Sequence, residues 1–208
     1  MEDVLDTYAK PLSAAEPVIC LDEQPYQLLD DTRPAQPIQP GQPAKQDYEY
    51  RRCGTCSLFV AVEPKGGRRY VQARRQRKRG DFARFLRDLL HRYPRAQRIH
   101  LVLDNLNTHN EKSLWETFDR KTATRLLRRI EWHHTPKHAS WLNMAEIEIS
   151  VLTKQCLDRR IATLDDVQCQ ASAWSQDRNR RKATIQWAFR RSDARRVFPE
   201  LYRHRIAG

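Results

Sequence analysis

The sequence contains no long hydrophobic run. Its apolar stretches all fall short of the roughly 20 residues that a membrane-spanning helix needs, and no basic segment followed by an apolar stretch begins the chain. Cysteine is also scarce, with five residues at irregular spacing. An odd number of scattered cysteines argues against a disulfide framework and fits a reducing compartment. We therefore expect a cytoplasmic protein without a membrane partner.

Acidic residues are outnumbered by basic ones. The chain has 26 Asp and Glu against 38 Lys and Arg, which gives a formal net charge of +12. A length of 208 residues fits one domain, and a hydrophobic share of 39% with five tryptophans is sufficient for one core. A protein this basic is expected to bind polyanions, with nucleic acid as the first choice.

The charge is distributed unevenly along the chain. Residues 1–31 hold eight acids and one lysine, a net charge of −7, whereas residues 68–98 carry +10 and residues 151–208 carry +7. Basic blocks of this size favour an anionic partner over simple solubility. The acidic block would repel a polyanion, so its presence needs a separate explanation. Binding of a divalent metal would be one.

Hydrophobic periodicity predicts an α/β fold in which a mixed five-stranded sheet is flanked by helices. Pro64, Gly66 and Gly67 indicate a hairpin turn, and four prolines in 33–47 indicate an extended loop. We expect a lead-in segment at 1–16, a catalytic domain at 17–189 and a basic tail at 190–208. The expected strands are 17–22, 58–63, 69–73, 99–104 and 130–134, and the expected helices are 81–93, 111–118, 123–129, 140–157 (capped by Ser140) and 164–179.

Two aspartates follow apolar strands. Asp22 ends the run VICLD and Asp104 ends HLVLD, and a charge at such a position is costly unless something compensates it. Either one alone would be a capping residue, but together they predict a shared site for hard cations. The third acid stays open between Glu146 and Glu148, which lie about 200° apart around one helix.

Several other residues have both a structural and a functional interpretation. The Cys53–Cys56 pair favours a hairpin turn over zinc, since the remaining cysteines lie in apolar segments. His133, His134 and His138 suggest a ligand cluster, although DNA contact or positioning is favoured over zinc. Trp141 is expected in the core.

Four sequence blocks together carry a family resemblance. They are VICLDE around Asp22, DYEYRRCGT at 47–55, LVLDNLNTH at 101–109 and HTPKHASWLNMAEIEIS at 134–150. The chain, from about Pro17 to Tyr202, resembles the catalytic domain of DDE transposases of the bacterial insertion-sequence branch of the mariner-like superfamily. The resemblance implies an RNase H-like fold with Asp22, Asp104 and Glu146 as the catalytic acids that hold two Mg²⁺ or Mn²⁺ ions.

The resemblance also implies a function and partners. The expected activity is metal-dependent cleavage and strand transfer of double-stranded DNA, at transposon ends and target, by a homodimer in the bacterial nucleoid. Complete family members carry a helix-turn-helix region, which would here be a separately encoded half. The alternative is a truncated or repurposed RNase H-like module that binds DNA without cutting it. Asn105 and His109 are expected to support the metal ligands, and the expected DNA contacts are Arg74, Arg75, Arg77, Lys78, Arg79, Lys137 and His138.

Overall fold

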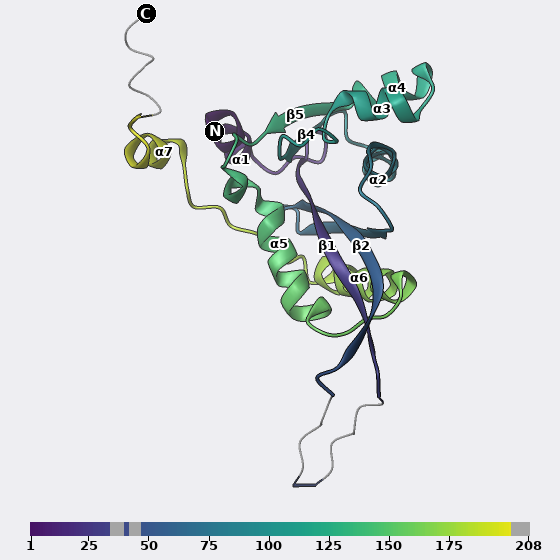
Figure 1. The fold of residues 1–208 in the computed structure, drawn as a ribbon. Coiled ribbons are helices and arrows are strands. Elements are labelled where there is room, and N and C mark those ends of the chain that lie inside the picture. Colours follow the sequence, from purple (N-terminus) through teal and green to yellow (C-terminus); the bar gives the residue numbers. More distant parts are fainter. Residues whose placement is uncertain (34–39, 42–46, 201–208) are drawn as a thin grey trace, which may run out of the picture.

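A five-stranded mixed sheet forms the centre of the protein in the computed structural model, which describes residues 1–33, 40–41 and 47–200 (Figure 1). The strand order is β3-β2-β1-β4-β5. Strand β1 pairs antiparallel with β2 and parallel with β4, and the β2–β3 and β4–β5 pairs are antiparallel and parallel, respectively. The predicted α/β class is confirmed. The strands are β1 (Val18–Asp31), β2 (Tyr50–Glu63), β3 (Arg68–Arg74), β4 (Ile99–Leu103) and β5 (Ile130–His134).

Helices cover both faces of this sheet. Helices α2, α3 and α4 pack on one face, and α1, α5, α6 and α7 lie over the other (Figure 1). None of the helices described is long and apolar enough to cross a bilayer. The helices are α1 (Glu2–Ala9), α2 (Arg79–His91), α3 (Glu111–Thr117), α4 (Arg120–Leu127), α5 (Met144–Leu152), α6 (Leu164–Arg180) and α7 (Arg191–Val197).

The alternation of side chains along the strands builds two cores. Leu21, Phe59 and Leu101 point to the α2 face, where the rings of Phe59 and Phe85 stack with centroids 5.2 Å apart. Residues one position along, such as Val102, point to the other face and meet α1 and α5. The period of two along each strand thus decides which helix a residue touches.

The first strand is longer than predicted, which changes the place of Asp22. Strand β1 pairs with β4 only from Val18 to Cys20 and then continues as an edge strand against β2. Beyond Pro25, where β3 no longer pairs with β2, the two strands form a two-stranded ribbon that extends away from the helices (Figure 1). Asp22 therefore lies inside β1, just beyond its pairing with β4, and not at a strand end. The sequence does not predict this ribbon, because its polar residues and Pro25 resemble a loop, although an edge strand tolerates both.

Four other expectations can be compared with the structure. The predicted hairpin turn joins β2 to β3, and Gly67 is required there, because its φ is +65° and a Cβ would lie 2.7 Å from the carbonyl carbon of Lys182. Cys53 and Cys56 lie within β2, so the predicted turn at this pair is wrong. Trp141 is 41% exposed and not in the core. The loop at 33–47 lies largely outside the described residues.

The predicted helix 140–157 is broken into three pieces. A 3₁₀ turn (Ser140–Leu142) precedes α5, and a π-helical turn (Thr153–Leu157) follows it. The α5 cap is Asn143, whose side-chain oxygen accepts from the Ala145 amide at 3.1 Å, and not Ser140. An asparagine side chain satisfies a free amide at the helix start, so the cap sets where α5 begins.

Candidate active site

Asp22 is held from two sides at the point where β1 leaves β4. The Glu23 amide donates to its Oδ1 at 2.8 Å, and Asn143 Nδ2 donates to its Oδ2 at 3.3 Å. The same Asn143 group donates to the Leu21 carbonyl at 2.9 Å, which ties β1 to the start of α5. Burial, with a smaller contribution from the negative charges of Asp104 and Glu146, raises the pKa of Asp22 to about 6, although the hydrogen bond from the Glu23 amide opposes this rise.

Asp104 follows β4 and is anchored by His109. The His109 ring donates from Nδ1 to the Asp104 carboxylate and from Nε2 to Glu23 Oε1 at 3.0 Å. Burial of the ring disfavours its charge, but the hydrogen bonds to Asp104 and Glu23 prevail and raise the pKa of His109 to about 9. His134 Nε2 donates to the His109 carbonyl at 2.9 Å, so β5 also supports this loop.

The two glutamates of α5 face different surroundings. Glu148 is fully buried, and its carboxylate accepts from Arg69 Nε at 2.7 Å and from Arg178 Nε at 2.6 Å. Glu146 lies in the first turn of α5, near enough for its charge to raise the pKa of Asp22. Within the described residues, the Glu146 carboxylate has no hydrogen bond or ion pair. Of the two acids of α5, Glu146 is thus the one whose charge acts on Asp22.

The segment before α5 is fixed by α1. The buried Tyr8 hydroxyl donates to the Leu142 carbonyl at 2.7 Å and lies 3.4 Å from the Met144 amide, which donates to it. Burial raises the pKa of Tyr8 well above its usual range, so the hydroxyl stays protonated and keeps donating. Residues 1–16 therefore help to position Glu146.

Four carboxylates and one imidazolium make this sheet edge strongly acidic. Sequence reasoning identified Asp22, Asp104 and His109 but missed Glu23, whose side chain is 2% exposed and whose Oε2 has no hydrogen-bond partner. It also missed Asn143. Glu23 is a second acid directly after Asp22, and this acidic pair was the signal that the sequence contained. The two side chains point to opposite faces of the strand. An all-oxygen donor set suits hard divalent cations such as Mg²⁺ and Mn²⁺, so the residues fit such ions.

Comparisons with known proteins identify the family. The sequence profile described as DDE superfamily endonuclease matches residues 17–168, well over half of the chain. The chain belongs to the DDE superfamily endonuclease family. Among curated proteins, none shows significant sequence similarity.

Solved structures show what fold this DDE endonuclease has. The Mos1 mariner paired-end complex with Mn is 16% identical (TM-score 0.55; 86% of this chain and 55% of that one), and the Mos1 strand transfer complex is 17% identical (TM-score 0.55; 86% and 54%). The catalytic domain of Mos1 mariner transposase is 11% identical (TM-score 0.54; 86% and 81%). These similarities confirm the RNase H-like fold. The chain spans about half the length of the first two structures.

The remaining residues expected to act in this candidate site are exposed. Asn105 directly follows Asp104, is exposed, and makes no side-chain hydrogen bond among the described residues. Lys137 and His138 are exposed in the loop between β5 and α5, where His138 adopts a left-handed φ of 63°. That loop begins next to Asp104, because the Thr135 amide donates to the Leu103 carbonyl at 2.9 Å.

The basic run between β3 and α2 divides into paired and unpaired residues. Arg79 Nη1 lies 2.8 Å from Glu116 Oε1, and Arg74 Nη2 lies 3.6 Å from Asp88 Oδ2. Arg75, Arg77 and Lys78 are exposed, and in the described part of the chain their side chains form no ion pair. These three side chains are therefore available to phosphates.

Proposed function

We propose that this chain is the catalytic domain of a transposase that cuts double-stranded DNA at transposon ends and joins the released strand to target DNA, using two Mg²⁺ or Mn²⁺ ions. One observation carries the proposal: Asp104 and Glu146 lie near enough to Asp22 for their charges to raise its pKa, and no lysine or arginine of the described residues pairs with these three acids. An uncompensated acidic cluster of this kind favours cations from outside.

Each residue of the site has a definable part in this function. Asp22, Asp104 and Glu146 would hold the ions, and bound ions would activate the attacking hydroxyl and stabilise negative charge on the phosphate. His109 keeps one oxygen of Asp104 occupied, which would leave the other free to hold an ion. Asn143 orients Asp22 and, as the α5 cap, sets the position of Glu146.

The proposed partners follow from DNA as substrate. Arg75, Arg77, Lys78, Lys137 and His138 would contact the phosphate backbone. Joining two transposon ends favours a homodimer, and end recognition would come from a separately encoded helix-turn-helix half. The working unit is the domain at 17–189, flanked by 1–16 and 190–208, in the bacterial nucleoid.

The test is nicking of supercoiled plasmid by the purified chain with Mn²⁺ or Mg²⁺. Asp104→Asn should reduce nicking about a thousandfold or more, because the substitution removes the charged metal ligand but keeps the size of the side chain. Asp165→Asn, at an exposed position in the first turn of α6, is the matched control and should nick as the wild type does.

Two results would contradict this function. Equal nicking by the wild type and Asp104→Asn would show that another site, or a contaminant, cuts the DNA. Salt-sensitive DNA binding without nicking by the wild type would instead identify a binding module. Fluorescence anisotropy with a labelled duplex separates these outcomes, because Asp104→Asn should still bind DNA.

A further inference from the structure

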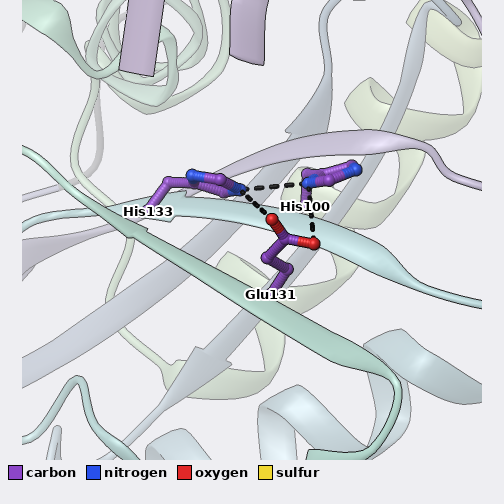
Figure 2. Close-up of side chains that lie close together, drawn as sticks. All are labelled: His100, Glu131 and His133. Carbon is purple, nitrogen blue, oxygen red and sulfur yellow. Dashed lines mark hydrogen bonds and ion pairs between the residues drawn. The ribbon is translucent and has the colours of Figure 1, made fainter. Parts of the chain in front are cut away.

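A second group of ligand-type side chains lies on β4 and β5, away from the carboxylate site. His100 pairs in register with Glu131, and His133 lies two residues further along β5, so all three side chains share one face of the sheet. Figure 2 shows the two imidazole rings facing each other with the Glu131 carboxylate next to both. Their potential ligand atoms all lie within 4.8 Å of one another.

The separations of these atoms suit a small metal ion. His100 Nδ1 lies 3.0 Å from His133 Nε2, and the Glu131 oxygens lie 3.6 Å from the first and 3.8 Å from the second (Figure 2). Ligands of a tetrahedral zinc ion, each about 2.0–2.1 Å from the metal, lie about 3.3 Å apart. The three ligand atoms, all within 4.8 Å of one another, are thus close enough for side-chain adjustment to give zinc geometry.

We propose that His100, His133 and Glu131 form a zinc-binding site with a fourth position open to water. Two imidazoles and one carboxylate are a ligand set that zinc prefers over magnesium, which favours oxygen alone. The two histidines are buried and the Glu131 side chain is 39% exposed, with Arg98 Nη1 3.2 Å from its Oε2, so an ion that enters from the Glu131 side would take the place of this exposed ion pair.

Residues around the two histidines already provide the hydrogen-bond partners that orient the ligands of such a site. His133 Nδ1 donates to Asp3 Oδ2 at 2.8 Å, which leaves Nε2 unprotonated and free to bind a metal. A carboxylate behind a ligating histidine orients its ring and strengthens it as a ligand. Thr7 Oγ1, 3.2 Å from the same Nδ1, is a second polar neighbour from α1.

His100 needs one tautomer change to bind the ion. In the metal-free protein, the hydrogen-bond pattern assigns a chain in which Lys10 donates to His100 Nε2 at 3.0 Å and His100 Nδ1 donates to His133. With zinc on Nδ1, the proton of His100 moves to Nε2, where the Glu16 carboxylate 3.9 Å away can accept it. The ring stays neutral throughout, and Lys10 is displaced.

This site is distinct from the carboxylate site. His100 precedes Asp104 by four residues of β4, which corresponds to about 13 Å along a strand. Bound zinc would link β4 and β5 to α1 through Asp3, and α1 in turn positions the start of α5 through Tyr8. The ion would therefore stabilise α1, the helix that positions the start of α5 and with it Glu146.

The experiment is a zinc titration of the full chain against a chromophoric chelator, in a background carrying Asp104→Asn, Cys53→Ser and Cys169→Ser. These changes weaken the carboxylate site and remove the two exposed thiols. We expect one zinc per chain, with affinity reduced about tenfold or more by Glu131→Gln and further by His100→Gln. Because Glu131 is partly exposed, Glu131→Gln should fold normally, which circular dichroism verifies.

Matched controls and a spectroscopic readout make the result decisive. His91→Gln and Glu111→Gln change the same residue types at exposed positions and should leave zinc affinity unchanged. Cobalt substitution should give visible bands of a four-coordinate ion without thiolate charge transfer. The proposal would be overturned if the chain did not bind stoichiometric zinc at micromolar concentration. It would also be overturned if Glu131→Gln and His100→Gln bound zinc as tightly as the background without these changes.

Discussion

Helix α5 carries two glutamates two residues apart, and their surroundings differ in one decisive respect. Glu148 lies between α5, β3 and α6, fully buried, with two arginine side chains bonded to its carboxylate. Glu146 lies at the sheet edge beside Asp22, half-buried, and no cationic side chain of the described residues reaches it. The protein itself neutralises the first carboxylate and leaves the second uncompensated.

This difference separates an acid that serves folding from one that serves a ligand. A buried carboxylate is tolerated when guanidinium groups saturate it, as Arg69 and Arg178 do for Glu148. An acidic cluster without such partners costs stability in the empty protein, and a bound cation would remove that cost. The comparison therefore predicts opposite effects of neutralising the two kinds of acid.

The largest expected effect is the loss of the buried ion pairs. Glu148→Gln should lower the free energy of unfolding by about 3–5 kcal/mol, because it leaves two arginines without their buried counter-charge. Arg69 is most affected, since its side chain is fully buried and its Nη1 has no hydrogen-bond partner. Urea denaturation followed by circular dichroism measures this loss.

Glu146→Gln is the control for this change. It alters the same residue type on the same helix and should change the metal-free unfolding free energy by less than about 1 kcal/mol, since no ion pair is lost. Similar destabilisation by both variants would refute the distinction between the two glutamates.

A smaller effect of opposite sign is expected for Asp22→Asn. The pKa of Asp22 is 3.8 in an unfolded chain and about 6 in the folded, metal-free protein. Its stabilising contribution is complete below pH 3.8 and is lost as the pH rises through 6, so at pH 7 the ionised group opposes folding. Asp22→Asn should therefore stabilise the metal-free protein by about 1–3 kcal/mol at pH 7.

Calorimetry at two pH values and with added metal tests this expectation. The gain should vanish near pH 4, where the wild-type carboxyl is largely protonated. Mn²⁺ or Mg²⁺ should raise the melting temperature of the wild type but not that of Asp22→Asn. An Asp22→Asn protein that is less stable than the metal-free wild type at pH 7 would show that the carboxylate is compensated after all.

Much of the fold could be predicted because periodicity reports burial directly. The five strands and the helices on both sheet faces follow from apolar residues at spacings of two or of three and four. The outer β1–β2 ribbon could not, because it buries little and so carries no such pattern. The apolar residues before Asp22 made it a candidate site residue at a strand end, although the strand continues past it.

The site was less accessible to sequence reasoning, because it depends on long-range pairing. Periodicity left Glu146 and Glu148 equal, since the arginines that neutralise Glu148 lie 79 and 30 residues away in sequence. The same holds for His100, which meets Glu131 only through the register of β4 and β5. A family resemblance selected Glu146, and the observed charge environment supplies a physical reason.

The smallest expected effect extends the comparison to basic residues. Arg77 is exposed and forms no ion pair within the described chain, whereas Arg180, also exposed, lies 2.7 Å from Asp177. Arg77→Gln should weaken duplex binding and lower the slope of log affinity against log salt by about one, because one phosphate contact is lost. Arg180→Gln should leave the slope unchanged in the same anisotropy titration. Equal slopes for both variants would show that an arginine's freedom from internal partners does not mark the DNA-binding surface.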